Sequence, residues 1–249
     1  MRILGAGGWI PTGTHATCSA LLRQGDAAVL IDAGTGIERL VRDRTLLEGV
    51  RQLDLVLTHF HLDHVAGLGY APGLRRAGGW PPRIWGPAAA LFGGSSEEVL
   101  RRIHSPPFYD ADFGLIASEV GELAVGEQAI GPFAVTARRQ EGHSTPTLAL
   151  RFDDLLTYCT DTPYDAGNAE LATGSRVLMH EVWFTEDARR NEEIHSSGRA
   201  AGAVASEAGV ERLVLIHLHP LDSHDAVLAE ARGVFPAAEL GSDGLELEL

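Results

Sequence analysis

The feature that most constrains this chain is a short apolar run that ends in a polar residue, repeated along the sequence. Five such residues are Asp32, His59, Asp161, His180 and His217. Runs of this length and composition are typical of buried strands. Open α/β sheets place their ligands at the carboxyl ends of strands. The repetition therefore predicts one site that the whole chain contributes to.

The same runs predict the fold class. Six of them are expected to be strands: 28–31, 53–57, 148–152, 155–158, 176–179 and 213–216. Helical patterns lie between some of them, at 36–42, 97–103 and 198–207. Interleaved strands and helices favour a layered α/β fold. Because the sequence shows no internal repeat and no low-complexity linker, we expect residues 1–249 to form a single domain.

The charge of the chain excludes several function classes. The formal net charge is −14 and every cation is Arg, because the sequence contains no Lys. The absence of Lys excludes Schiff-base chemistry and the lysine of a nucleotide-binding P-loop. An acidic chain lacks the field that attracts phosphate backbones, so no long nucleic acid is expected as a partner. The Arg doublets, among them Arg189–Arg190, are interpreted as solvated surface.

The sequence carries no sign of secretion or membrane insertion. It has no secretory signal and no apolar stretch that approaches about 18 residues. The two cysteines, Cys18 and Cys159, form no disulfide framework and have no CxxC spacing. We therefore expect a cytoplasmic protein without a membrane partner.

Four potential metal ligands lie within six positions at the end of the run 53–57: His59, His61, Asp63 and His64. Zn²⁺ accepts both His nitrogens and Asp oxygens at about 2.0–2.2 Å. In extended chain, residues two apart point the same way, so His59 and His61 can share one ion. Asp63 and His64 follow where the chain turns, and they can face a second ion.

Three later residues complete a recognisable pattern: His143 in EGHSTP, Asp161 in TDT and His217 in LIHLHP. The chain thus resembles the metallo-β-lactamase superfamily, whose pattern is HxHxDH, a lone His, an Asp and a final His. The resemblance implies a four-layered αββα sandwich with two metal ions at one edge. It implies that His59, His61 and His143 hold the first ion, that Asp63, His64 and His217 hold the second, and that Asp161 bridges them.

The resemblance also bears on chemistry. True β-lactamases of the superfamily place Cys at the Asp161 position or otherwise vary the site, which argues against antibiotic hydrolysis. Two ions about 3.5–4 Å apart can share a water, lower its pKa and polarise the bond under attack. With five His, two Asp and no thiolate, the ligand set favours Zn²⁺, while Mn²⁺ or Fe stays open.

A further stretch narrows the reaction. The segments HEVW, from His180 to Trp183, and HSS, from His195 to Ser197, are similar to the HEAT and HST patterns of ribonuclease Z and related phosphodiesterases. The resemblance implies that His195 assists at the leaving group and that Glu181 orients it. Asp63, His195 and Glu181 are therefore the candidate catalytic residues. A positioned acid contributes about 10²–10⁴-fold to such a step.

The leading hypothesis is a dinuclear phosphodiesterase for a small or short substrate: a cyclic nucleotide, a cyclic phosphate or an oligonucleotide end. Residues 144–160 leave room only for two strands and a turn, not for the long tRNA-gripping arm of bacterial ribonuclease Z. A tRNA 3′-processing endonuclease is therefore disfavoured. Acyl hydrolysis, by a thioesterase or a lactonase, is the enzymatic alternative. A metal-binding sensor without catalysis is the non-enzymatic alternative.

Three questions stay open at the level of sequence. His219 lies two residues after His217 and could face the same side, although His217 directly ends its apolar run and is the preferred ligand. The stiff segment 105–109 lines a pocket or caps the core. The sequence also leaves open whether a homodimer completes the pocket.

Overall fold

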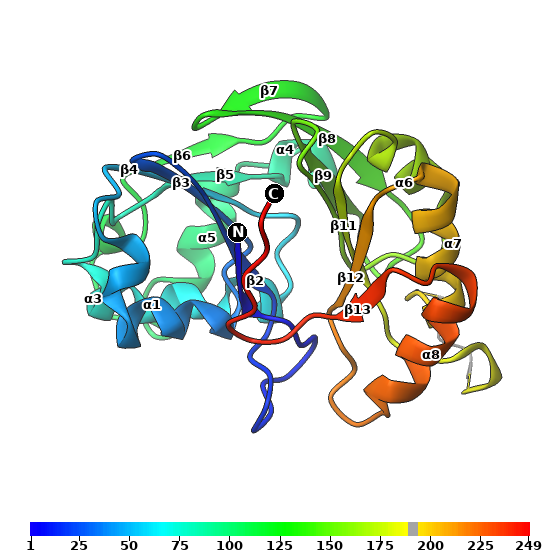
Figure 1. Cartoon of the computed structure of the whole chain (residues 1–249). Helices are drawn as coiled ribbons and strands as arrows, with labels where there is room; N and C mark the ends of the chain where they lie inside the picture. Colours follow the sequence, from blue (N-terminus) through cyan, green and yellow to red (C-terminus); the bar gives the residue numbers. More distant parts are fainter. Residues whose placement is uncertain (189–193) are drawn as a thin grey trace.

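Two β-sheets packed face to face organise the molecule, and helices cover the outer face of each sheet (Figure 1). This computed structural model describes residues 1–188 and 194–249. The four layers confirm the predicted α/β class and the αββα sandwich. The doublet Arg189–Arg190 lies outside the described residues.

The first sheet comes from the first half of the chain. Within the described residues it has six strands, in the order β1 (Arg2–Gly5), β2 (Ser19–Gln24), β3 (Ala27–Ile31), β4 (Gln52–Val56), β5 (Arg83–Gly86) and β6 (Glu119–Glu122). The first three strands pair antiparallel, and β3 to β6 pair in parallel. The carboxyl ends of β3 and β4 therefore lie at one edge.

The second sheet has the same mixed character. Its seven strands, counted over the described residues, are β7 (Gly126–Ile130), β8 (Phe133–Gln140), β9 (Thr147–Phe152), β10 (Leu156–Cys159), β11 (Val177–Glu181), β12 (Arg212–Ile216) and β13 (Ala238–Leu240). Strands β7 to β10 pair antiparallel, and β10 to β13 pair in parallel. The carboxyl ends of β10, β11 and β12 therefore lie at one edge of the second sheet.

The helices divide between the two sheets. In Figure 1, α1, α3 and α5 lie beside the first sheet, and α6, α7 and α8 lie beside the second. The α-helices are α1 (Glu38–Arg42), α2 (Leu62–Val65), α3 (Ala71–Leu74), α4 (Ala88–Phe92), α5 (Ser96–Ile103), α6 (Ala166–Ala172), α7 (Gly198–Ala208) and α8 (His224–Val234). Short 3-10 turns are η1 (Thr35–Ile37), η2 (Arg44–Leu47), η3 (Ala66–Tyr70), η4 (Phe113–Leu115) and η5 (Glu186–Ala188). No helix in the described ranges has the length and apolar character needed to cross a bilayer.

Strand β3 shows why the central strands read as unbroken apolar runs. Val29 and Ile31 pack into the core between the sheets, whereas Ala28 and Leu30 pack into the core beneath the helices of the first half. Successive side chains of a strand point to opposite faces, and here both faces are covered. A strand that alternated apolar and polar residues would have left one of those faces without apolar side chains for packing.

All six predicted strands are confirmed within two residues at each end, as are the helices predicted at 97–103 and 198–207. The helix predicted over 36–42 is wrong in its first turn, where the chain forms η1 before α1 begins at Glu38. The strand predicted over 176–179 extends two residues further than expected, because β11 continues to Glu181. His180 therefore lies inside β11, buried, where its Nδ1 donates to the carbonyl oxygen of Glu181 at 2.9 Å.

Segment 105–109 packs on the first sheet's side of the molecule. The ring of Tyr109 lies edge-on to His104, with 5.4 Å between ring centroids, and packs against the core cluster of the first-half helices. Phe108 is largely exposed. Of the two interpretations of this segment, these contacts favour the one in which it caps the core.

Candidate metal centre

The candidate site lies where strand ends of both sheets meet. Asp32 follows β3, Asp161 lies two residues after the end of β10, and His217 follows β12. All three adopt left-handed backbone, with φ of 56°, 50° and 51°. Residues other than Gly seldom occupy this region, and such conformations cluster at functional sites. Each turn bends the chain sharply at the point where the strand delivers its polar side chain.

The structure brings all seven predicted ligands into overlapping groups, in which one ligand atom per residue lies within 4.8 Å of the others. One group is Asp63, His64 and His217, the set that the resemblance assigned to the second ion. The remaining groups all contain Asp161; they are His59 with His64, His61 with His143, and His195 with His217. His59 therefore lies near residues of both assigned sets.

Asp161 occupies the middle of these groups. Its carboxylate oxygens lie 3.1 Å from Nε2 of His64, 3.4 Å from Nε2 of His217, 3.6 Å from Nε2 of His143 and 4.0 Å from Nε2 of His59. Asp63 Oδ2 lies 3.3 Å from the same His217 nitrogen. Asp161 is thus the carboxylate with the widest reach across the centre.

Hydrogen bonds at the back of two rings direct their remaining nitrogens into the centre. His64 Nδ1 donates to Asp32 Oδ2 at 2.8 Å, and His59 Nδ1 lies 3.0 Å from the hydroxyl of Thr58. Nε2 of His64 faces the Asp161 carboxylate at 3.1 Å, whereas Nε2 of His59 is buried without a hydrogen-bond partner among the described residues. Buried polar atoms are rarely left in this state. An inward nitrogen without a partner, beside a second one that faces a carboxylate, fits the ligand atoms of a cation.

The charges of the centre support the same fit. Burial lowers the pKa of His59, His61 and His143, so their neutral rings keep a lone pair available for an ion. At His64, burial opposes protonation, yet the carboxylates of Asp161 and Asp63 raise its pKa well above the usual value. The surroundings of its Nε2 therefore favour positive charge. A donor set of imidazoles and carboxylates suits a divalent ion such as Zn²⁺.

Asp32 is a part of the centre to which the sequence analysis gave no role. It accepts the His64 bond and also bonds from the backbone N–H and hydroxyl of Thr58. A carboxylate behind a ligating His is a recurrent arrangement, and it fixes the ring and raises its basicity. The signal was present, because Asp32 stands at a strand end as His59 and Asp161 do.

We expect Asp32→Asn to weaken metal binding by about 10–100-fold, the usual effect of losing such a partner. Asn tolerates left-handed backbone, so the turn survives while the negative charge behind His64 is lost. Titration of the metal-free protein with Zn²⁺ measures the change. Asp54→Asn is the matched control, because Asp54 is a buried strand carboxylate bonded to Trp85 and Gln52, outside the groups around Asp161. Equal affinity in both variants would contradict the role of Asp32.

Gly8 lies against the ring of His217. A Cβ added at Gly8 would come within 2.5 Å of Cε1 and Nδ1 of that ring, whereas a Cβ at Gly13 in the same loop would meet nothing within 4 Å. We expect Gly8→Ala to displace His217 and to lower metal-dependent turnover by about 100-fold, as a misplacement of about 1 Å can. Gly13→Ala should leave both turnover and metal content unchanged. Full activity in Gly8→Ala would contradict this placement of His217.

Glu181 and His195 form a pair beside the centre. Nδ1 of His195 lies 3.0 and 3.1 Å from the two oxygens of Glu181, and both residues are buried. Glu181 also accepts the backbone N–H groups of Thr162 and Ser196. These bonds fix the carboxylate at the end of β11. One ring nitrogen of His195 lies within 4.8 Å of ligand atoms of Asp161 and His217.

His219 and the cysteines belong to none of the potential metal groups found among the described residues. His219 Nδ1 pairs with Asp222 at 3.2 Å, and the residue joins none of the potential metal groups found in the described chain. Cys18 and Cys159 are buried, and burial raises the pKa of both thiols. The candidate donors are therefore nitrogen and oxygen atoms.

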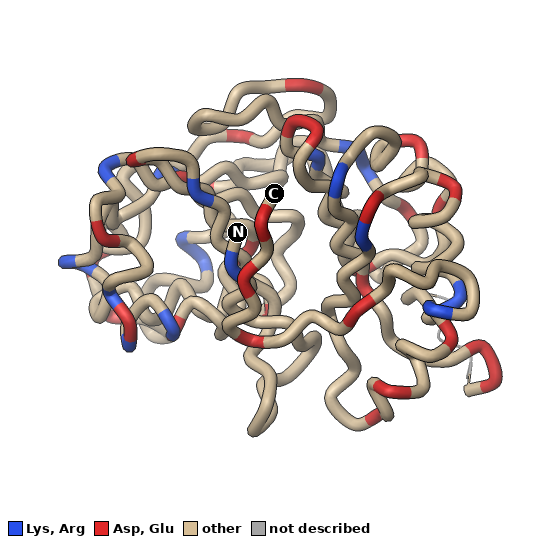
Figure 2. The backbone as a smooth tube through the Cα atoms, viewed as in Figure 1, with Lys and Arg blue, Asp and Glu red and all other residues tan. Residues whose placement is uncertain are grey.

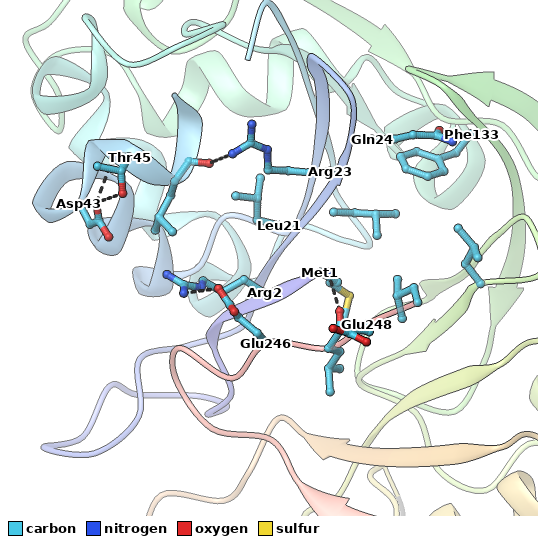
Figure 3. A pocket seen from close by; sticks show the side chains of 15 residues that line it. Met1, Arg2, Leu21, Arg23, Gln24, Asp43, Thr45, Phe133, Glu246 and Glu248 are labelled. Atoms are coloured by element: carbon cyan, nitrogen blue, oxygen red, sulfur yellow. Dashed lines mark hydrogen bonds and ion pairs between the residues drawn. The ribbon is translucent and has the colours of Figure 1, made fainter. Parts of the chain in front are cut away.

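A cavity of about 1020 Å³ lies near the chain termini rather than at the centre (Figure 3). Its lining includes Met1, Leu21 and Phe133, together with Arg2, which pairs with Glu246. None of the seven predicted ligands lines it. Strand β2 is antiparallel to β3, so its end at Gln24 marks the edge of the sheet opposite the centre. This cavity is separate from the candidate site.

Residues 27–218 match a protein family described as the β-lactamase superfamily domain. This match covers most of the chain and includes all seven predicted ligands. The chain belongs to the metallo-β-lactamase superfamily. Membership implies divalent metal ions, which agrees with the grouped His and Asp side chains.

Two relatives of this metallo-β-lactamase superfamily member carry hydrolase names. Ribonuclease Z of Methanopyrus kandleri is 29% identical and covers 98% of this chain and 96% of its own. The probable metallo-hydrolase YhfI of Bacillus subtilis is 27% identical over 94% of this chain and 93% of its own. The YhfI crystal structure superposes with a TM-score of 0.78 at 23% identity, over 98% of this chain and 96% of that one. A diphosphatase of the PhnP family has a TM-score of 0.73 at 19% identity, over 99% and 96%. The protein is a metallo-hydrolase of this superfamily.

Proposed function

We propose that this metallo-hydrolase is a phosphodiesterase that acts on a small or short phosphodiester at a two-metal centre. The observation that carries the proposal is the His195–Glu181 pair, held within reach of Asp161 and His217. An alkoxide is a poor leaving group, so cleavage of a phosphodiester benefits from a positioned acid. An activated acyl ester has less need of one.

In this proposal, each side chain of the centre has a role. His59, His61 and His143 would hold one ion, Asp63, His64 and His217 would hold another, and Asp161 would be a ligand shared by the two sets. Divalent ions, when bound, activate water near neutral pH and polarise the phosphate ester. Zn²⁺ is the favoured ion, and Mn²⁺ or Fe is compatible with the same donors. His195 delivers a proton to the leaving oxygen, and Glu181 keeps its ring in the donating orientation.

The charge around the centre favours a substrate with few phosphates. The described segments that adjoin it contain no Lys or Arg: 5–17, 32–36, 57–67, 141–146, 160–165, 181–188, 194–198 and 217–224. In Figure 2 the backbone of the β1–β2 loop, at the bottom of the view, carries neither the colour of Lys and Arg nor that of Asp and Glu. Long nucleic acids are bound chiefly by cationic side chains along their phosphates. A single phosphodiester needs no such row.

The connection between His143 and Asp161 also supports a small substrate. It consists of β9, a turn at 153–155 and β10, with three further residues before β9 and one after β10. This connection holds no inserted arm that could grip tRNA. One relative is named ribonuclease Z. Because this connection lacks such an arm, we propose a substrate smaller than tRNA.

Hydrolysis assays test the proposed function directly. The protein, stripped of metal and then supplied with Zn²⁺ or Mn²⁺, is expected to hydrolyse bis(p-nitrophenyl) phosphate and a 2′,3′-cyclic nucleotide. A chelator should remove both activities. Acyl esters, thioesters and lactones serve as the comparison class. Turnover of these acyl substrates without any metal-dependent phosphodiester turnover would overturn the proposal in favour of acyl hydrolysis.

A further inference from the structure

Trp183 lies against the proposed acid and a proposed metal ligand at once. Its indole stacks on the His195 ring, with 4.5 Å between centroids and 19° between planes. It lies 5.2 Å from the His217 ring at 29°, and His219 meets it edge-on at 4.4 Å. The residue is only 8% exposed. Three near-parallel rings therefore form one packed set beside the centre.

Backbone hydrogen bonds hold Trp183 in register with the segment that carries His195. The N–H of Trp183 donates to the carbonyl of Ser196 at 2.9 Å, and the N–H of Gly198 donates to the carbonyl of Phe184 at 3.1 Å. The segment after β11 thus runs beside the segment before α7. A shift of the Trp183 backbone relative to the segment that carries His195 would have to break these two bonds.

Glu181 alone does not fix the whole imidazole of His195. A hydrogen bond to Nδ1 restrains one atom of the ring, and the ring can still tilt about that contact. A flat partner on the ring face removes this freedom, because offset stacking of aromatic rings is favoured and tilting separates the faces. The ring of His219 packs perpendicular to the same indole, with 4.4 Å between ring centroids.

We infer that Trp183 is a positioning residue that sets the plane of the His195 ring for proton delivery to the leaving group. The inference rests on the proposed phosphodiesterase function. Trp183 stands at the fourth position of the HEVW segment, where the similar HEAT pattern has Thr, a side chain that offers no stacking face. The sequence of this chain therefore adds an aromatic support to the Glu181–His195 pair.

Kinetics on two diesters tests the inference. Diphenyl phosphate has a poorer leaving group than bis(p-nitrophenyl) phosphate and depends more on the acid. We expect Trp183→Ala to lower kcat on diphenyl phosphate by about 10–100-fold and kcat on the nitrophenyl diester by less than about 3-fold, with KM little changed. Trp183→Phe keeps a stacking face and should stay within about 3-fold of the parent on both substrates.

Trp80→Ala is the matched control, since Trp80 is 7% exposed and packs in the core cluster of the first-half helices. It should destabilise the fold to a similar degree without changing the ratio of the two kcat values. If Trp183→Ala leaves that ratio at the parent value, the inference is wrong, while an active parent enzyme still supports the proposed function.

A second measurement needs no activity. In the metal-free protein, the ring protons of His195, assigned by comparison with His195→Gln, should show an upfield NMR shift from the indole face. Trp183→Leu should remove the shift and broaden the signals, and Trp183→Phe should retain most of it. Unchanged, sharp His195 signals in Trp183→Leu would overturn the inference even if no phosphodiester proved to be a substrate.

Discussion

Replacing Asp161 with Ala is expected to remove bound metal and to lower phosphodiester turnover by more than about 10³-fold. Loss of a residue that only supports a metal ligand lowers metal affinity or activity by about 10–100-fold. Asp161 itself faces four histidines of the centre, so we expect a larger effect. The loss also leaves His64 without its nearest inward carboxylate. Metal content of the purified variant and kcat/KM on bis(p-nitrophenyl) phosphate measure the effect.

Asp165→Ala provides the control for Asp161. Asp165 caps α6 and pairs with Arg138 at 2.7 Å, and it joins none of the potential metal groups in the described chain. Loss of a helix cap costs about 1 kcal/mol, so this variant reports general destabilisation. It should keep its metal and most of its turnover. Two bound ions and near-parental activity in Asp161→Ala would rule out the central role given to this carboxylate.

Replacing His195 with Ala is expected to lower turnover of diesters with poor leaving groups by about 10²–10⁴-fold, the usual contribution of a positioned acid. The metal content should hardly change, because the resemblance assigns the ions to other residues. Rates on the nitrophenyl diester should fall much less, since nitrophenolate leaves without a proton. The dependence of kcat on leaving-group basicity is therefore the decisive measurement.

His104→Ala is a control of matched burial for His195. His104 is 7% exposed against 9% for His195, and it bonds to the carbonyl of Leu100 at the end of α5. That variant should keep the parental dependence on the leaving group. If kcat depends on leaving-group basicity in the same way in His195→Ala and His104→Ala, acyl hydrolysis becomes the favoured function. That reaction uses the same metal centre and has less need of an acid.

The strand ends were predictable from the sequence because burial there leaves a strong pattern. Four of the five residues 53–57 are apolar, since β4 is covered on both faces, and the polar residues that follow come where the strand ends. The seven grouped residues follow from this pattern and from the resemblance. Their grouping in space is shown by the structure, whereas their roles as ligands stay predictions.

The outer strands and the supporting contacts were not predictable in the same way. Strand β7 has exposed and half-buried residues at most of its positions, so its sequence lacks an apolar run. The contact of Gly8 with His217 joins residues 209 positions apart and leaves no local pattern. From the sequence alone, Trp183 is typical of an ordinary core residue. Only the structure shows that its ring stacks on the ring of His195.

The left-handed backbone at Asp32, Asp161 and His217 lowers the folding stability of this chain at its centre. Each such residue costs about 1–3 kcal/mol, a sizeable share of the roughly 5–15 kcal/mol by which most domains stay folded. Glycine at any of the three positions would relieve the backbone while deleting the side chain. We therefore expect the most stable variants of this fold to lack activity. Selection for thermostability alone should replace the residues at these three strand ends first.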